Sequence, residues 1–207
     1  MKKQLRQPAD EKTSRRWVAG ILIVFSAVAL TASLMLSVDY VKLLQNPDAT
    51  FSCDINSALS CVSVMKTPQA DVLFGIPNSF FGMMAFAVLL TIGVVLAVGA
   101  KLPKWFKVCT QIAALGGLAA AWWMFFDSLY HIGVLCPWCL TVTTSMTIMF
   151  GAITHWNLRE NTFEFKRPTY DKILKFLGSD ADKIIVAAIL VIFAALAILK
   201  FGARLFG

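Results

Sequence analysis

Five long apolar segments alternate with polar segments along this chain. They cover residues 17–38, 80–100, 105–126, 137–156 and 184–199. A helix of about 20 residues is about 30 Å long, which matches the hydrocarbon core of a bilayer. A signal peptide is the alternative for the first segment, but that segment exceeds the usual apolar core of about 7–15 residues, and further apolar segments follow. We therefore expect an all-α integral membrane protein with five transmembrane helices.

The polar segments divide the chain into parts. We expect a basic tail at 1–16, a four-helix transmembrane bundle at 17–156, a basic linker at 157–183, and a fifth transmembrane helix with a short tail at 184–207. Within the bundle, residues 39–79 form a mostly polar loop. We expect this loop to carry a short half-helix. The linker has amphipathic character over 170–177, where an interfacial helix could form.

Charge orients these parts. Apolar residues make up 58% of the chain and charged residues only 15%, unlike a soluble domain. Of the 19 Lys and Arg residues, 15 fall in the segments 1–16, 101–107 and 157–183, which five spans place on one side of the membrane. Cytoplasmic segments carry such an excess, so we predict a cytoplasmic N-terminus and an extracytoplasmic loop at 39–79. Because the net charge of +7 follows the topology, we expect no nucleic-acid partner.

Two cysteines open the fourth apolar segment in the motif Cys136-Pro137-Trp138-Cys139. Pro137 disfavours the α-conformation at Cys136, so the helix should begin at Pro137. Both thiols then lie near unpaired helix N–H groups, which favour the reactive thiolate. The motif therefore indicates a redox pair at one face of the membrane.

Cys53 and Cys61 lie in the extracytoplasmic loop. In one continuous helix eight residues rise about 12 Å, whereas the Cα atoms of a disulfide lie about 4.4–6.8 Å apart. The chain must therefore turn between them, and turn and capping side chains are present at Asp54, Asn56 and Ser57. We expect a short helix from Ser57 onward that carries Cys61, with Cys53 on a mobile stretch before it.

Structural disulfides and a zinc site are the alternatives for these four cysteines. A Cys-x-x-Cys pair is a poor structural cross-link, because closing so small a loop removes little chain entropy. One such pair suits zinc, but the seven residues between Cys53 and Cys61 exceed the usual spacing of about two to four. We therefore prefer thiol–disulfide exchange and expect no metal. The fifth cysteine, Cys109, lies near the cytoplasmic end of the third span, where we expect a packing residue.

Three motifs, in this order, resemble the vitamin K epoxide reductase family. They are Cys53-Asp54 with Cys61 eight positions later, Gly75-Ile76-Pro77-Asn78-Ser79-Phe80-Phe81-Gly82, and the Cys-x-x-Cys that opens the fourth helix. The resemblance covers roughly 17–156 and is closest to bacterial members without a fused thioredoxin-like domain. It implies a four-helix bundle around a quinone, menaquinone or ubiquinone, in the bacterial inner membrane.

The resemblance also implies roles for the cysteines. Cys139 would face the quinone and Cys136 would be its exchange partner, while Cys53 and Cys61 would form the shuttle pair. A separate, extracytoplasmic thioredoxin-fold protein of DsbA-like type would supply the electrons, so that disulfides form in exported proteins. Mixed-disulfide exchange allows such pairs to be connected in series.

Two residues outside the cysteine pairs would contact the quinone. The resemblance implies that Asn78 hydrogen-bonds a quinone carbonyl and that Phe81 lines the pocket. The alternative for Asn78 is a helix N-cap, since Asn is favoured there. Animal members carry Tyr four residues after the second cysteine of the Cys-x-x-Cys, where this chain has Thr143. This difference argues against epoxide chemistry.

Two other functions remain open. The DsbB type of quinone-linked thiol oxidase has the same kind of bundle, but its Cys-x-x-Cys comes first in the chain. A membrane scaffold is the non-enzymatic alternative, and it would need no exchanging thiols. Asp127 and His131 lie near the Cys-x-x-Cys, and we expect both on a solvated loop.

Overall fold

The computed structural model describes residues 8–47, 51, 53–55, 58–71 and 75–205. The described residues are helical apart from turns, loops and one isolated bridge between Leu59 and Leu135. The prediction of an all-α membrane protein is therefore confirmed. The long helices are α1 (Pro8–Gln45), α3 (Asn78–Ala97), α4 (Lys104–Asp127), α5 (Pro137–Arg159) and α7 (Ala181–Leu205). The shorter elements are α2 (Cys61–Met65), the 3-10 turn η1 (Pro68–Asp71), the π-helical turn η2 (Ser128–Ile132) and α6 (Arg167–Gly178).

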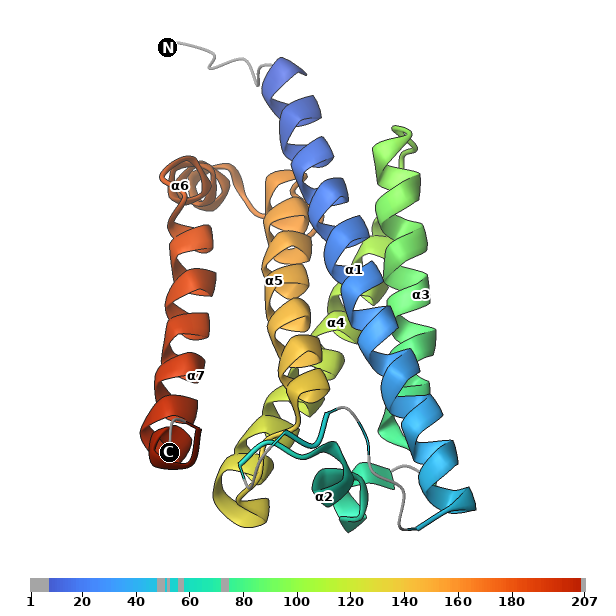
Figure 1. Cartoon of the computed structure of the whole chain (residues 1–207). Coiled ribbons are helices and arrows are strands. Elements are labelled where there is room, and N and C mark those ends of the chain that lie inside the picture. The colour runs from blue at the N-terminus through green and yellow to red at the C-terminus, as the bar shows by residue number, and fades with distance from the viewer. Residues whose placement is uncertain (1–7, 48–50, 52, 56–57, 72–74, 206–207) are drawn as a thin grey trace.

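Four of the long helices form a bundle, and the fifth lies beside it. α1 packs against α3 and α5, and α4 packs against α5 (Figure 1). α7 runs alongside α5 at the edge of the bundle. The two termini lie at opposite ends, and the end that holds α2 is called the cysteine end below (Figure 1).

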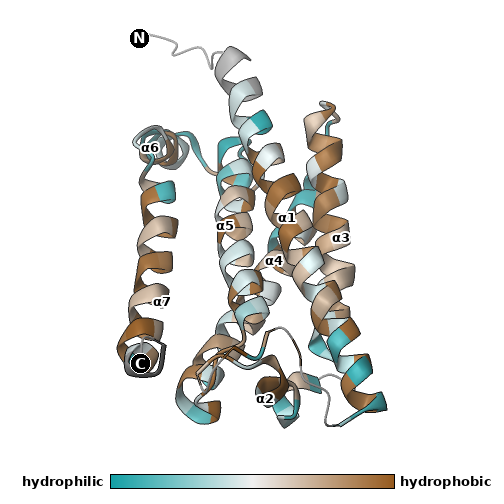
Figure 2. Ribbon diagram, viewed as in Figure 1, coloured by the Kyte–Doolittle hydropathy of each residue, from teal (hydrophilic) through white to brown (hydrophobic). Residues whose placement is uncertain are grey.

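Four helical segments are long and apolar enough to cross a membrane: Thr13–Gln45, Asn78–Ala97, Lys104–Ile132 and Ala181–Gly202. The predicted span at 137–156 forms helix α5 but is not among them. Its threonines and serines lower its hydropathy, and Figure 2 shows it paler than α7. Thr143, Ser145 and Thr147 are buried, because α5 lies between other helices rather than against lipid. A helix in this central position does not need an apolar surface all round.

Two elements, α1 and α6, depart most clearly from the sequence prediction. α1 continues to Gln45, so residues 39–45 belong to a helix and the polar loop begins later. The linker contains α6, which lies across the axis of α7 rather than along it (Figure 1). The Tyr170 hydroxyl donates a hydrogen bond to the Arg159 carbonyl and ties α6 to the end of α5. The helix expected over 170–177 is thus present, and its place at a membrane surface stays a prediction.

Close packing of α1 against α3 depends on glycine. A Cβ atom on Gly93 would lie 3.0 Å from the backbone nitrogen of Ile23, and on Gly82 it would lie 2.8 Å from Ser33 Oγ. Larger residues at these positions would force the two helices apart. This contact fixes the wall formed by α1 and α3 next to the cysteine end.

Candidate active site

Cys136 and Cys139 lie where α5 begins. Cys136 has extended backbone angles, φ −100° and ψ 120°, and Pro137 is the first helical residue, as predicted. The Cys139 N–H donates a hydrogen bond to Cys136 Sγ over 3.3 Å, so the sulfur acts as the helix cap. Both cysteines are free thiols in this structure, and Cys136 is only 2% exposed.

Cys53 and Cys61 are joined in a disulfide with their Cα atoms 5.7 Å apart. Cys61 is the first residue of α2, and Ser60 caps that helix through a hydrogen bond from the Ser63 N–H. The expected helix start at Ser57 is therefore wrong, since the chain is extended at Leu59 and becomes helical only at Cys61. Asn56 and Ser57 themselves lie outside the described residues.

Asp54 does contribute the turn chemistry expected of it. Its Oδ1 accepts hydrogen bonds from the Ser60 hydroxyl at 2.6 Å and from the Val62 N–H at 3.3 Å. The turn between the two cysteines is thus fastened to the first turn of α2. Because both cysteines of this pair are in a disulfide, the four cysteines do not form a four-thiolate zinc site in this structure.

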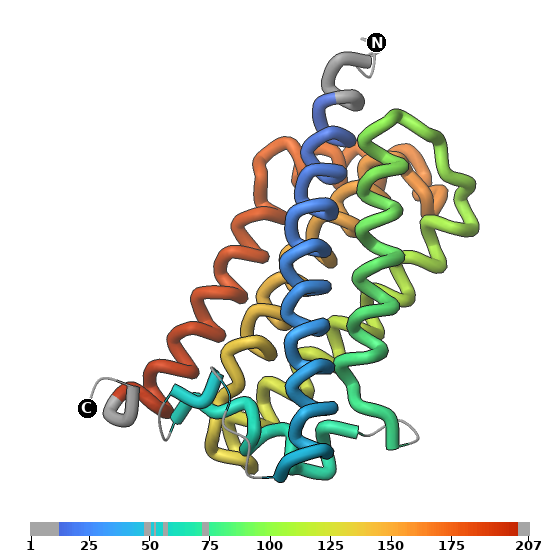
Figure 3. The backbone as a smooth tube through the Cα atoms, turned by 45° about the vertical axis from the view of Figure 1, so that its right-hand side comes forward, coloured from blue at the N-terminus to red at the C-terminus, as the bar shows by residue number. Residues whose placement is uncertain are grey.

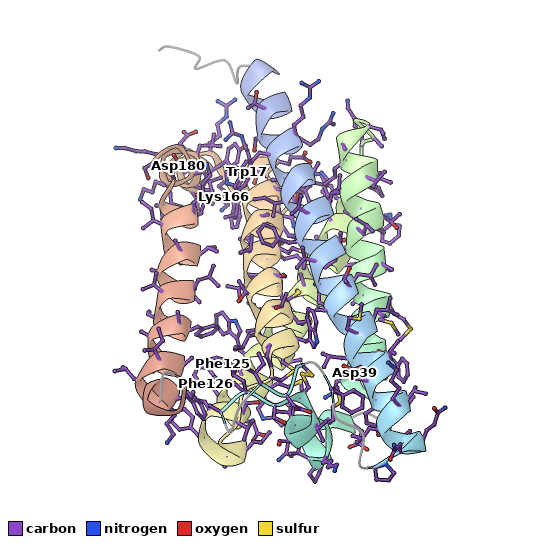
Figure 4. All side chains as sticks on the ribbon, in the orientation of Figure 1. Trp17, Asp39, Phe125, Phe126, Lys166 and Asp180 are labelled. Atoms are coloured by element: carbon purple, nitrogen blue, oxygen red, sulfur yellow. A yellow bond between two sulfur atoms is a disulfide. The ribbon has the colours of Figure 1, made fainter. Side chains whose placement is uncertain are left out.

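A short bridge brings the two cysteine pairs together. The Leu135 N–H donates to the Ala58 carbonyl at 2.8 Å, and the Ser60 N–H donates to the Leu135 carbonyl at 3.0 Å. Each of these two bonds lies within three residues of a reactive cysteine. As a result, Cys136 Sγ lies 3.4 Å from Cys61 Sγ. Figure 4 draws the disulfide in yellow at this end of the bundle.

The surroundings of Cys136 favour its thiolate. A hydrogen bond from the Cys139 thiol lowers the pKa of Cys136, and the backbone N–H groups of Cys139 and Trp138 act in the same direction. These effects outweigh burial, which raises the pKa. A thiolate is the attacking and leaving form in disulfide exchange, so this geometry suits exchange with Cys61.

A cavity of about 90 Å³ lies next to Cys139, between α1, α3, α4 and α5. One water molecule needs about 10–15 Å³, so the cavity has room for a larger ligand. Its lining is mostly apolar and includes both cysteines of the Cys-x-x-Cys. The other lining residues are Ser33, Leu36, Asn78, Ser79, Gly82, Ala121, Met124, Phe125, Ser128, Leu135, Leu140, Val142 and Thr143.

Asn78 lies in this lining with its amide held in place. Its Nδ2 donates to the Gln69 carbonyl at 2.7 Å and to Met124 Sδ at 3.6 Å. The N-cap alternative is wrong, because Asn78 is the first helical residue of α3, Pro77 precedes it as the cap, and no side chain caps the helix. The bond to the thioether sulfur is the weaker of the two, so a ligand carbonyl could replace it.

Three further residues singled out in the sequence are Phe81, Thr143 and Cys109. Phe81 is half-buried but is not among the residues that line the cavity, so its contact with a ligand stays a prediction. Thr143 lines the cavity, and its hydroxyl donates to the Cys139 carbonyl at 2.9 Å. Cys109 is exposed on α4, so the expectation of a packing residue is wrong.

The sequence prediction that Asp127 lies on a solvated loop is also wrong. α4 extends through Asp127 and continues into η2, so no solvated loop exists there. The Asp127 side chain is 10% exposed, and its Oδ1 lies 3.0 Å from His131 Nδ1. His131 is 77% exposed, as expected of a solvated residue.

The model of the vitamin K epoxide reductase family matches residues 20–154. The chain belongs to this family. No curated protein matches it. Membership in the vitamin K epoxide reductase family makes the protein a membrane thiol–disulfide oxidoreductase rather than a scaffold. The family match also favours the vitamin K epoxide reductase type of bundle over the DsbB type. α6 and α7 lie outside the matched residues.

Sequence reasoning missed the Leu59–Leu135 bridge. Neither leucine has a reactive side chain. A single bridge between residues 76 positions apart also produces no periodic pattern of apolar residues in the sequence. A weak signal was present in the leucines that stand two positions before Cys61 and one position before Cys136. It could not have indicated which two backbones pair.

Proposed function

We propose that this protein takes two electrons from an extracytoplasmic thioredoxin-fold, DsbA-like dithiol protein and delivers them to a membrane quinone, menaquinone or ubiquinone. The proposal rests on one arrangement. Cys136 lies 3.4 Å from a cysteine of the other pair, while Cys139 lies in the wall of an apolar cavity. The first contact suits exchange between the pairs, and the second suits electron delivery to an apolar acceptor.

In this proposal the electrons pass through three thiol–disulfide exchanges. First, the partner's thiolate attacks the Cys53–Cys61 disulfide, and the resulting mixed disulfide is resolved by the partner's second thiol. The partner leaves oxidised, and Cys53 and Cys61 are left as thiols. Next, the Cys61 thiolate attacks Cys136 of a Cys136–Cys139 disulfide, which forms the Cys61–Cys136 bond and releases Cys139 as a thiolate. Finally, Cys53 attacks Cys61, restores their disulfide and frees Cys136.

The state in this structure corresponds to the end of that sequence. Cys53–Cys61 is a disulfide, and Cys136 and Cys139 are thiols. These two thiols hold two electrons and two protons. A quinone bound in the cavity would accept both and leave as a quinol, while Cys136 and Cys139 form their disulfide again.

The cavity lining suits a quinone. Apolar pockets with a few placed polar groups bind ring ligands with polar edges. Asn78 supplies a neutral donor whose orientation is fixed by the Gln69 carbonyl. Leu36, Met124 and Phe125 supply apolar surface from α1 and α4. Asn78 would orient a quinone carbonyl toward the Cys139 side of the cavity.

Reconstitution tests this function. Purified protein, a reduced DsbA-like partner and a short-chain quinone are mixed, and quinol formation is followed by absorbance together with partner thiols. We expect one quinol for each dithiol oxidised, and no turnover in Cys61→Ser or Cys139→Ser proteins. Cys109→Ser is the matched control, because Cys109 lies on α4 outside both pairs. Partner oxidation without quinol formation would contradict the proposal.

A further inference from the structure

α7 lies outside the residues matched by the family model, yet it reaches the loop that leads into Cys61 and takes part in the bridge. The cysteine end of α7 lies beside that loop in Figure 3. Phe201, near the end of α7, is only 2% exposed. It belongs to a buried apolar cluster with Ala58, Leu129 and Leu135. Ala58 and Leu135 share the 2.8 Å hydrogen bond that sets the bridge.

A second contact fastens the same part of α7. The Phe193 ring stacks on Phe125 with centroids 4.7 Å apart, and it also meets Trp122 edge-on at 5.3 Å. Phe125, labelled in Figure 4 between α7 and the bundle, belongs to the Phe201 cluster and lines the cavity. The position of α7 at this end is therefore set by aromatic packing on α4 as well as by Phe201.

The bridge needs such support. It consists of two backbone hydrogen bonds, and an isolated pair of extended segments is at best marginally stable in water. Its two sides come from distant parts of the chain, one leading into Cys61 and the other into Cys136. A misplacement of about 1 Å in reacting groups can slow a reaction about 100-fold. Packing beside the bridge therefore bears directly on the distance between the two sulfurs.

We infer that α7 positions the two cysteine pairs for exchange, with Phe201 as a positioning residue that packs against the Ala58–Leu135 connection and holds Cys61 beside Cys136. This role deepens the proposed function and rests on it. Among the described residues, the apolar cluster that holds Phe201 contains none of the four cysteines. Phe201 acts through the bridge.

The test measures how favourably Cys61 and Cys136 pair. In a full-length protein with Cys53, Cys109 and Cys139 replaced by Ser, the two remaining thiols are equilibrated with reduced and oxidised glutathione. Forming their disulfide passes two electrons and two protons to oxidised glutathione, which becomes two reduced molecules. The equilibrium gives the effective concentration of one thiol at the other. We expect Phe201→Ala to lower it by about tenfold.

Matched variants separate positioning from general stability. Leu199→Ala changes a residue of α7 that is 84% exposed and should leave the effective concentration within about twofold of the parent. Phe201→Leu keeps an apolar side chain and should recover most of the loss. In a second background that retains only Cys136 and Cys139, Phe201→Ala should have no effect, because both thiols lie at the start of α5.

Two results would overturn the inference. One is an unchanged Cys61–Cys136 equilibrium in Phe201→Ala, and the other is an equal loss for both cysteine pairs, which would mark a role in stability alone. Neither measurement uses a partner or a quinone. A failure of the proposed function would instead appear as absent turnover in the unaltered protein, so the two failures are distinguishable.

Discussion

Several groups lie against the sulfur of Cys136, among them the thiol of Cys139, the backbone N–H of Cys139 and the sulfur of Cys61. The first two stabilise negative charge on Cys136, and the third is the atom that exchange requires. The sequence predicted helix N–H groups near this sulfur, because a proline after the first cysteine fixes the helix start. It could not predict the third, since the approach of Cys61 depends on tertiary pairing through Leu59 and Leu135.

The lowered pKa of Cys136 leads to a prediction about pH. A thiol with a lowered pKa becomes a thiolate at a lower pH than an ordinary cysteine, whose pKa is about 8.5. The alkylation rate of Cys136, followed by mass spectrometry in protein that retains the Cys53–Cys61 disulfide, should therefore reach half its maximum at a lower pH than the alkylation rate of an ordinary cysteine thiol. Cys139→Ala removes the largest cause and should move the midpoint upward. A midpoint that stays in place in Cys139→Ala would contradict this explanation.

Asn78 is predicted to act on electron delivery rather than on thiol exchange. A neutral hydrogen bond is worth about 1 kcal/mol, and more when the acceptor gains negative charge. Asn78→Ala should therefore slow quinol formation about tenfold or more, while one equivalent of pre-oxidised enzyme still oxidises its partner at the parental rate. Stopped-flow measurement of both steps separates them. Equal slowing of both would assign Asn78 to holding the Gln69 turn instead.

At the scale of helices, the sequence predicted the number and order of the long elements but not all their functions. The length of the apolar segments was enough to predict α1, α3, α4 and α7, which are long and apolar enough to cross a membrane. It was less informative for α5, whose buried threonines contact protein instead. The extension of α1 through 39–45 was missed because polar residues at the end of a long helix resemble a loop. The start of α2 was missed because Leu59 fits helical spacing but pairs with Leu135.

The contact between α1 and α3 leads to a prediction about stability. Gly93→Ala would place a Cβ atom 3.0 Å from the Ile23 nitrogen and the Leu22 Cβ atom, so it should destabilise the protein by about 1–3 kcal/mol. Gly20→Ala is the matched control, because no atom of the described residues lies within 4 Å of its Cβ position. That change should be neutral or stabilising by up to about 1 kcal/mol. Thermal unfolding in detergent compares the two, and equal midpoints would contradict the close packing.

For the whole molecule, the polar network at the end opposite the cysteines connects α7 to the bundle. His155 Nδ1 lies 2.6 Å from Asp182 Oδ2, and His155 Nε2 lies 3.0 Å from Ser14 Oγ. Trp17 packs edge-on against His155, and Lys183 lies over the Trp17 ring. α7 is thus held at both ends, by polar contacts at one and aromatic packing at the other. Sequence reasoning gave the helix but no function for it, because these partners are far apart in the chain.

The orientation in the membrane is a prediction for the whole chain. The basic segments place α6 on the cytoplasmic side and the cysteine end outside. In a cysteine-free background, a membrane-impermeant maleimide added to intact cells should label Lys66→Cys and not Lys172→Cys. Both lysines are exposed in the structure. Labelling of Lys172→Cys before cell lysis would reverse the orientation.

The relay between the two cysteine pairs is the central claim, and trapping its intermediate tests it most directly. Cys53→Ser removes the thiol that resolves the Cys61–Cys136 bond, so this disulfide should accumulate in oxidised protein. Peptide mapping by mass spectrometry after thiol blocking should then find Cys61 linked to Cys136, with Cys139 free. Cys61→Ser should give no cross-link between the two motifs. If Cys53→Ser instead shows Cys136 linked only to Cys139, with Cys61 free, the relay through the 3.4 Å sulfur contact is contradicted.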